Sequence, residues 1–462
     1  MKHFFKTRLL ACLATLGLAP AVASAAPFTP GNIVVVRIGD AAAATTSGSA
    51  AATLLLEYTP TGTLVQTIAL PTAVAGNNRI LTNTVSSSSD AVLTRSANGA
   101  YLVLTGYDAA VGTASLTGTT SAANNRVIGR IAVDGTVDTS TRIGDAFSGS
   151  ATQGTNIRSA ATVDGSNFYA VGSSSGVVYV PFGNNGTTAT TALNTTAPTN
   201  NRSIGVYGGN LYVGAASGAF QGISQVGTGL PTAAPQTVTA LSGFPTATGP
   251  QPYAFYFADL SATVPGVDVV YVADDRTTTS GGIQKWSLVS GTWTLNGTIT
   301  GAVGTTAGPQ VRGVSGMVAG TNVSLVASGT GGLYFLADNA GYNAAPTTVV
   351  LPTPIATAPT NTTFRGVVFA PVAAAVSATI ASRALPGLSV FPNPATTRLT
   401  IDLPKAGAAT VALRDLTGRL VLAPAALATD RQLRLPANLA SGVYMLAVTQ
   451  GSETAVRRIE KK

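Results

Sequence analysis

Four arginines occupy equivalent positions in related segments of the chain and are the strongest candidates for ligand binding. The segments begin at Asn156, Asn200 and Gln310, with a short copy at Phe364, and in each an apolar run follows the Arg. The recurring residues are Arg158, Arg202, Arg312 and Arg365, and Tyr253 stands near the same position of a further copy. Arginines that face one mouth of a ring would bind carboxylate, sulfate or phosphate groups. Alternatively, each Arg binds a carbonyl or an Asp of the next repeat and holds the ring together.

Acidic side chains offer a second kind of chemistry. Two carboxylates, or an Asp with Tyr253 or Tyr256, could serve a glycosidase or lyase without any histidine. The candidates are Asp259, Asp268, Asp274, Asp275 and Asp338. Several stand where turns are expected, and Asp is a common turn residue. We therefore assign no catalytic residue from the sequence.

Histidine and cysteine chemistry is excluded by two counts. The single His is His3 and the single Cys is Cys12, and both precede the expected start of the mature chain. Disulfides, thiolate nucleophiles, Ser-His-Asp triads and His- or Cys-bound zinc therefore drop out. Paired Asp residues, Asp134 with Asp138 or Asp274 with Asp275, lack the full ligand spacing of a calcium loop. The sequence predicts no metal site and no cofactor.

Aromatic residues gather in one repeat and would suit the flat faces of sugar rings if they were exposed. They are Tyr253, Phe255, Tyr256, Phe257, Trp286 and Trp293. The alternative is that they form the core between sheets. The consecutive run from Tyr253 to Phe257 places aromatics on both faces of a strand, so part of the cluster is expected to reach the surface.

The repeats predict an antiparallel β architecture. Each holds short runs rich in Val, Tyr, Leu and Thr, joined by turn dipeptides such as Asp134-Gly135 and Gly208-Gly209. Aligned arginines are 44 residues apart from Arg158 to Arg202 and 53 apart from Arg312 to Arg365. Four strands in roughly 40 to 60 residues is the size of a β-propeller blade. We predict six blades, or seven if Asn77-Asn78-Arg79 marks an extra unit.

Ring closure should join the two ends of the body. The short copy from Phe364 offers an innermost strand without partners, whereas the runs at residues 31–40, 53–62 and 63–71 offer strands without an innermost one. Together they would make one blade, which hides both sheet edges.

The beginning of the chain reads as a secretory signal peptide, residues 1–25. Lys2, Lys6 and Arg8 precede the apolar run Leu9–Leu18, and Ala23-Ser24-Ala25 has the small residues of a cleavage site. No membrane span is expected in the mature chain, because the uncharged run 366–382 contains Pro371 and is too short.

Charge is distributed unevenly. The formal net charge is +8, but residues 26–383 hold 13 basic and 13 acidic residues, whereas residues 384–462 hold 10 basic and 5 acidic residues. The neutral body lacks the basic surface expected of a nucleic-acid binder. We therefore expect no nucleic-acid partner.

The composition changes after a predicted linker, residues 372–387, and residues 388–462 read as a small sandwich of about seven strands. Its motifs are LSVFPNP with Pro392, Asn393 and Pro394, DLTGR with Asp415, Gly418 and Arg419, LASGVY with Gly442 and Tyr444, and a basic end, Arg457–Lys462. This segment closely resembles the type A C-terminal sorting domain of the type IX (Por) secretion system of Bacteroidetes. The resemblance implies export through the inner membrane, passage through an outer-membrane pore that reads the domain, and delivery to the cell surface or medium.

Three functions follow for the body, residues 26–371. The first is a non-catalytic binding or scaffold module at the cell surface, with a glycan or another surface polymer as ligand. The second is a polysaccharide hydrolase or lyase that uses Asp and Tyr. The third is a structural protein of the envelope or matrix, consistent with a content of only 10% charged residues. In each case, the type IX secretion machinery is the expected partner of the C-terminal domain.

Overall fold

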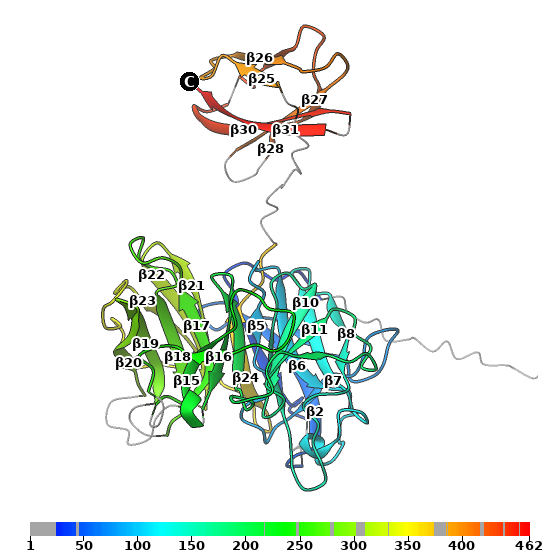
Figure 1. Ribbon diagram of the computed structural model, residues 1–462, viewed down its shortest axis with the longest axis vertical. Helices are drawn as coiled ribbons and strands as arrows, with labels where there is room; N and C mark the ends of the chain where they lie inside the picture. Colours follow the sequence, from blue (N-terminus) through cyan, green and yellow to red (C-terminus); the bar gives the residue numbers. More distant parts are fainter. Residues whose placement is uncertain are drawn as a thin grey trace, which may run out of the picture. The chain divides into compact units, whose positions relative to one another are not determined.

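The computed structural model describes residues 25–42, 46–216, 218–245, 249–277, 281–301, 310–330, 332–373, 385, 387–415, 420–437, 439–451 and 453–462. It divides into two compact units, Met1–Ala373 and Ala374–Lys462 (Figure 1), which are described separately. The division falls within the segment expected to be a linker. The expected signal peptide lies outside the described residues apart from Ala25.

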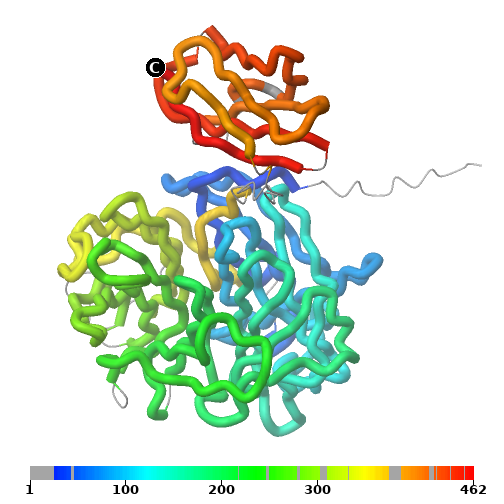
Figure 2. Tube along the Cα trace, turned by 45° about the horizontal axis from the view of Figure 1, so that its top comes forward, coloured from blue at the N-terminus to red at the C-terminus, as the bar shows by residue number. Residues whose placement is uncertain are grey.

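The two ends of the body pair in one sheet. Its strands are β24 (Thr363–Phe369), β1 (Ile33–Ile38), β2 (Ala50–Tyr58) and β3 (Leu64–Ala69). They pair in the order β24-β1-β2-β3, antiparallel throughout. In Figure 2 the golden strand of the late chain runs beside the blue strands of the early chain. The predicted closure of the body by its last copy is confirmed.

The next two units follow the same meander. The second consists of β5 (Thr94–Arg95), β6 (Tyr101–Tyr107), β7 (Arg126–Ala132) and β8 (Val137–Ile143). The short strand β4 (Thr82–Thr84) pairs with both β2 and β6 and so links the first two units into one sheet. The third unit consists of β9 (Ile157–Ala161), β10 (Asn167–Gly172), β11 (Val177–Pro181) and β12 (Thr191–Ala192).

Three more units complete the body. The fourth consists of β13 (Ser203–Tyr207), β14 (Asn210–Ala215), β15 (Gly222–Val226) and β16 (Val238–Ala240). The fifth consists of β17 (Pro252–Ala258), β18 (Val269–Asp274), β19 (Gly282–Val289) and β20 (Thr292–Ile299). The sixth consists of β21 (Val311–Ala319), β22 (Asn322–Gly329) and β23 (Gly332–Asp338). Two 3-10 helices, η1 (Leu116–Gly118) and η2 (Gly218–Phe220), lie in connections.

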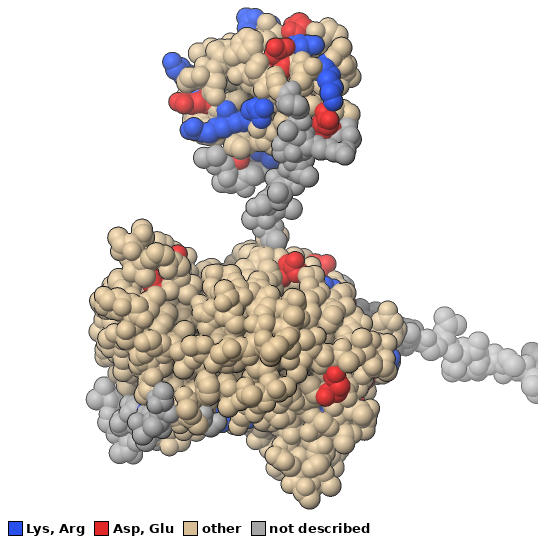
Figure 3. All heavy atoms as spheres, viewed as in Figure 1, with Lys and Arg blue, Asp and Glu red and all other residues tan. Residues whose placement is uncertain are grey.

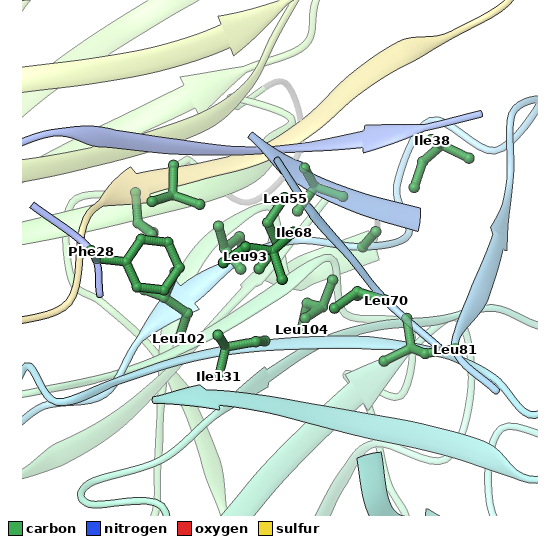
Figure 4. Close-up of a cluster of buried hydrophobic side chains, with 14 of the residues drawn as sticks. Phe28, Ile38, Leu55, Ile68, Leu70, Leu81, Leu93, Leu102, Leu104 and Ile131 are labelled. Atoms are coloured by element: carbon green, nitrogen blue, oxygen red, sulfur yellow. The ribbon is translucent and has the colours of Figure 1, made fainter. Parts of the chain in front are cut away.

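The first strands of the units form a closed ring. Neighbours contact in the order β24, β5, β9, β13, β17, β21 and again β24. A buried apolar cluster fills each interface between consecutive units; the one between the first and second, shown in Figure 4, contains Leu55, Ile68, Leu93, Leu104 and Ile131. Five further clusters fill the other interfaces. The body is therefore an all-β, propeller-like ring in which each sheet covers the next.

Local sequence explains the turns and the crowded centre. Gly135 has φ 83° in the turn between β7 and β8, and the Asp134 carboxylate accepts the backbone N–H of Thr136 at 2.9 Å. Near the axis, a Cβ atom at Gly366 in β24 would overlap the backbone N of Leu93 from the second unit. A residue without a side chain is needed there because the innermost strands approach so closely.

The C-terminal unit holds seven strands in two sheets. One sheet has the order β25 (Ser389–Phe391), β26 (Arg398–Asp402), β29 (Gln432–Arg434), and the other has the order β28 (Leu420–Ala426), β27 (Thr410–Asp415), β30 (Gly442–Gln450), β31 (Glu453–Lys461). Both sheets contribute to one core, in which Leu399 and Ile401 join Leu413, Leu446 and Ile459. On the face shown in Figure 3, charged side chains are frequent on this unit and sparse on the body.

Candidate functional site

The five residues predicted to bind a ligand stand at the beginnings of the innermost strands. Arg158 lies in β9, Tyr253 in β17, Arg312 in β21 and Arg365 in β24, and Arg202 directly precedes β13. Because these strands neighbour one another around the ring, the structure brings the five side chains to one mouth of the axis. We call this set, together with Asp90 and Asp275, the axial mouth.

Tyr253 is the contact point of two of these arginines. Arg202 Nη1 donates a hydrogen bond to Tyr253 Oη at 2.8 Å, and the Arg202 Cζ lies 4.4 Å from the centre of the Tyr253 ring. The Arg312 Cζ lies 5.8 Å from the same ring centre. Tyr253 Oη also lies 3.2 Å from Ser88 Oγ of the second unit. The ring thus contacts two cations, an arrangement that favours charged guanidinium groups.

Two arginines of the axial mouth pair with carboxylates. Arg312 Nε donates to Asp275 Oδ1 at 2.8 Å. Arg365 Nε lies 3.4 Å from Asp90 Oδ1, and the same guanidinium donates to the carbonyls of Val85 and Ser87. Burial lowers the pKa of Arg365 and raises that of Asp90, and in each case the partner's charge opposes the shift.

The other two arginines have only neutral partners in the described part of the chain. Arg158 Nη1 donates to Asn200 Oδ1 at 2.6 Å and to the carbonyl of Asn201 at 2.9 Å, while its buried Nε has no partner. Burial, and after it the charge of Arg202, lowers the pKa of Arg158 to about 10. Neither of these two neighbouring arginines forms an ion pair within the described residues, although the charge of Asp90 acts on Arg158 from a distance.

All four arginines bind a group from an adjacent unit, which is the pattern that the stapling interpretation predicts. Arg158, Arg365 and Tyr253 are at most 7% exposed, whereas Arg202 and Arg312 are partly exposed. Direct contact with a ligand is therefore open to Arg202 and Arg312. Tyr253 contacts both of them, and Arg158 binds the Asn200-Asn201 segment that precedes Arg202. Asp90 was not recognised from the sequence, although it opens the copy DAVLTRS.

A cavity of about 260 Å³ lies farther along the axis and is lined by residues of the innermost strands and the segments beside them. Its walls include Arg95, Tyr207, Tyr256 and Ser315. Tyr207 Oη donates to the carbonyl of Phe255 at 3.1 Å. Burial raises the pKa of Tyr256 to about 12, so this phenol is neutral at ordinary pH.

Four of the five acidic candidates for catalysis are held by structural partners, whereas Asp259, directly after β17, is exposed. Asp268 is buried just before β18 and accepts the backbone N–H groups of Leu260 and Ser261 at 2.8 and 2.7 Å. Asp338 lies 2.7 Å from both Lys285 Nζ and Tyr271 Oη. Asp274 binds Arg276 and Gln284. Asp274 and Asp338 also accept the backbone N–H of the residue two positions later, from Arg276 and Ala340, as Asp does in a turn. The turn interpretation therefore fits these two residues, whereas Asp275 pairs with Arg312.

The aromatic cluster lies almost entirely in the core. Five of its six members are at most 6% exposed, namely Tyr253, Phe255, Phe257, Trp286 and Trp293. Tyr256 is half-buried and faces the axial cavity. The expected surface aromatics are thus limited to Tyr256. Residues of β14 and β15 in the fourth unit pack against Phe255, Phe257, Trp286 and Trp293, whereas Tyr253 is buried at the axial mouth.

The predicted sorting residues occupy turns and strand ends of the C-terminal unit. Asn393, between Pro392 and Pro394, donates to the carbonyl of Arg458 at 3.0 Å and accepts the N–H of Glu460 at 2.8 Å. These bonds fix the Pro-Asn-Pro turn to β31.

The other motifs lie around β27 and β30. Tyr444 Oη donates to the carbonyl of Ala440 at 2.8 Å, Gly442 opens β30, and Asp415 ends β27 opposite Tyr444. Gly418 and Arg419 lie outside the described residues. Within the part of the chain that is described, no helix is long and apolar enough to cross a membrane.

A search of curated proteins found no match. Among solved structures, PorZ, an essential surface component of the type IX secretion system of Porphyromonas gingivalis, is 14% identical with a TM-score of 0.30; the match covers 90% of this chain and 64% of PorZ. This chain thus spans less than two thirds of the length of PorZ.

Two other solved structures are similarly distant. A candidate 6-phosphogluconolactonase of Bacteroides uniformis is 14% identical with a TM-score of 0.36, over 88% of this chain and 97% of that one. The extracellular domain of a candidate one-component system of B. thetaiotaomicron is 11% identical with a TM-score of 0.34, over 90% of this chain and 56% of that one.

The family model of the secretion system C-terminal sorting domain matches residues 389–462, which hold the motifs quoted above. Such a domain directs a protein to the secretion machinery and to the cell surface or extracellular space. The C-terminal unit therefore belongs to the family of type IX secretion sorting domains, and it follows an all-β, propeller-like body that this system secretes.

Proposed function

We propose that this protein is a six-bladed β-propeller that binds an acidic glycan or another anionic surface polymer outside the cell without transforming it. The observation that supports this function most is the excess of positive charge at the axial mouth. Four arginines meet two carboxylates there, and Arg158 and Arg202 have neutral partners in the described residues. Oxyanions of a polymer would supply the missing negative charge.

Arg202 and Arg312 are the residues proposed to contact the ligand. Arg158, Tyr253 and Arg365 are proposed to position them and to add to the positive potential, since these three side chains are buried. A pocket of about 330 Å³ adjoins Arg312 and is lined by Thr330, Thr357, Thr362 and Thr363, among others. Hydroxyl groups beside a guanidinium suit a polyhydroxylated chain that carries acidic groups.

Binding without catalysis is favoured by the state of the carboxylates. Asp268, Asp274, Asp275 and Asp338 each have structural partners, and general acid–base chemistry needs a carboxyl group that is available to a substrate. A ligand at this site would therefore meet cations and hydroxyl groups rather than a pair of reactive acids.

Delivery is proposed to use both ends of the chain. Residues 1–25 act as a signal peptide, residues 372–387 as a linker, and residues 388–462 as an immunoglobulin-like sorting domain. Within this domain, the machinery is proposed to read the Pro-Asn-Pro turn, the sequence motif from Asp415 to Arg419 and the Gly442–Tyr444 strand start. Deleting residues 388–462 should leave the body in the periplasm, and surface display of that truncated protein would contradict the assignment.

The test of ligand binding uses residues 26–462 with polygalacturonate, a sulfated polysaccharide and neutral dextran. We expect binding to an anionic polymer that weakens as salt is added, and a loss of roughly tenfold or more on Arg202→Ala or Arg312→Ala. Arg398→Ala, which removes an exposed Arg of the C-terminal unit, is the matched control. Shortening of the polymer would indicate a hydrolase or lyase. Absence of both binding and products would favour a structural protein of the envelope.

A further inference from the structure

A second pair of arginines faces a pocket at the outer side of the ring, away from the axial mouth. The pocket has a volume of about 500 Å³ and lies where β8 meets the turn after β11. Arg142 and Asp138 belong to β8, Phe182 and Asn185 follow β11, and Arg79 precedes β4. The pocket thus combines residues of the second and third units with the segment that precedes β4.

Backbone hydrogen bonds fix the positions of both arginines. The Arg142 N–H donates to the carbonyl of Asn184 at 2.7 Å, and the backbones of Arg142 and Asn185 form an isolated parallel β-bridge. The Arg79 N–H donates to Thr139 Oγ1 at 2.9 Å. The main chains that carry the two guanidinium groups are therefore held by β8 and its neighbours, as a preorganised site requires.

The two guanidinium groups themselves have no hydrogen bond or ion pair within the described residues. Their Nε atoms are buried and unpartnered, which is costly for a charged donor. Burial, and after it the charge of Arg79, lowers the pKa of Arg142, and the charge of Asp108 opposes that shift. The buried Nε atoms are out of a ligand's reach, but both side chains line the pocket, so an anion there would bind through their terminal Nη groups.

The nearby carboxylates are already engaged. Asp138 Oδ1 accepts both the N–H and the hydroxyl of Ser140, and its Oδ2 lies 3.6 Å from Arg130 Nη2. Asp108 Oδ1 accepts the backbone N–H of Ile80 at 3.3 Å. Because Asp138 pairs with Arg130, the three arginines Arg79, Arg142 and Arg130 face the two carboxylates Asp138 and Asp108, which leaves one net positive charge around the pocket.

The rest of the lining indicates what carries the anion. Phe182 is 38% exposed, and Arg130 lies over its ring at 3.9 Å from the centre. Side-chain amides of Asn77 and Asn185 and the carboxylate of Asp138 also line the pocket and suit hydroxyl groups. A volume of this order accommodates a small ligand of one or two sugar rings.

We propose that this pocket is a second binding site, in which Arg79 and Arg142 bind the carboxylate or sulfate of an acidic sugar while Phe182 contacts the ring. The geometry suits bidentate recognition of a planar or tetrahedral oxyanion by guanidinium groups. No residue is shared with the axial mouth, so the site stands whether or not the axial mouth binds a polymer.

The test separates the two sites. The protein of residues 26–462 carrying Arg202→Ala and Arg312→Ala is titrated by calorimetry with digalacturonate, a sulfated disaccharide, inorganic sulfate and neutral lactose. We expect an anionic probe to bind and lactose to bind at least tenfold more weakly. Adding Arg79→Gln or Arg142→Gln should raise the dissociation constant of the anionic probe tenfold or more. The tighter of the two sugar probes identifies the oxyanion as carboxylate or sulfate.

A second measurement needs no substitution at the site. Phenylglyoxal modifies accessible arginines, and mass spectrometry of the unsubstituted protein reports the rate for each residue. A bound probe should slow the modification of Arg79 and Arg142 and leave that of Arg398 unchanged. Unchanged rates at both arginines, or equal binding after Arg79→Gln and Arg142→Gln in folded protein, would overturn the proposal.

Discussion

Arg202 makes two contacts with Tyr253, a hydrogen bond to its hydroxyl and a cation–π contact with its ring. Its Nη1 lies 2.8 Å from the Tyr253 hydroxyl, and its Cζ lies 4.4 Å from the centre of the ring. Arg202 directly precedes β13 and Tyr253 begins β17, so this pair joins the fourth unit to the fifth. The orientation of a partly exposed cation therefore depends on a buried phenol.

The two contacts can be separated by substitution. Tyr253→Phe removes the hydroxyl and should cost about 1 kcal/mol of stability, because one hydrogen-bond acceptor of Arg202 is lost. Tyr253→Ala removes the ring as well and should lower stability further. It should also weaken the binding of anionic polymers more than Tyr253→Phe does. Denaturant unfolding and calorimetric binding measure both effects. Tyr101→Phe is the control, because the Tyr101 ring lies under Arg130 instead; equal losses from Tyr101→Phe and Tyr253→Phe would argue against a special role for Tyr253.

The ion pair between Arg365 and Asp90 should stabilise the closure of the ring. Asp90 is 1% exposed and Arg365 is 4% exposed. Arg365→Met leaves a buried carboxylate without its counter-charge, and we expect a loss of about 3–5 kcal/mol in the free energy of unfolding. Arg365→Met with Asp90→Leu should recover part of that loss, as a double-mutant cycle in urea would measure. A single-variant loss below about 1 kcal/mol would contradict this role.

Acid should weaken the contact between the fifth and sixth units. Burial alone would raise the pKa of Asp338, but the hydrogen bonds from Lys285 and Tyr271 hold it below its ordinary value. A carboxyl group whose pKa is lower in the folded state adds stability above its unfolded pKa, near ~3.9, and this contribution is lost as the pH falls through the folded value. We therefore expect the free energy of unfolding to decrease below about pH 4.

The variant Asp338→Asn isolates this contribution. It should be several kcal/mol less stable than the natural protein at pH 7, about 3–5, because Lys285 is left buried beside a neutral amide. The difference between the two proteins should shrink as the pH is lowered from 7 to 3, measured by urea unfolding at each pH. A constant difference over that range would show that Asp338 does not titrate with folding.

The sequence predicted the architecture of the body well, but it did not predict which groups each arginine contacts. Turns and strands are determined largely by residues close in the sequence, so turn dipeptides and short apolar runs could be recognised directly. The pairing of β24 with β1 was predicted by matching a last copy that lacked partner strands with early strands that lacked an innermost one. The tripeptide Asn-Asn-Arg, in contrast, occurs three times with three outcomes. Arg126 is fully buried against backbone carbonyls, Arg202 contacts Tyr253, and Arg79 lines the outer pocket with a buried Nε atom that has no partner among the described residues. The difference arises from residues of other units, which the local sequence does not contain.

The innermost strands approach each other so closely that adding one methyl group, by Gly366→Ala, should lower the free energy of unfolding. Gly366 follows Arg365 in β24, and its N–H donates to the carbonyl of Ala91 at 3.2 Å. A Cβ atom there would overlap the backbone of Leu93, which cannot move without disturbing the ring. Gly366→Ala should therefore cost about 1–3 kcal/mol or more in the free energy of unfolding.

Gly320→Ala is the matched control for that substitution. Gly320 has φ 65°, and no atom lies within 4 Å of the position that a Cβ would take. Gly320→Ala should therefore be destabilising only through its unfavourable backbone conformation, by about 1 kcal/mol. Urea unfolding of both variants measures the difference. A clearly larger loss for Gly366→Ala is expected if packing between β24 and the second unit closes the ring. Equal losses would mean that the innermost strands can separate to admit a methyl group, and that the outer pairing of β24 with β1 is sufficient for closure.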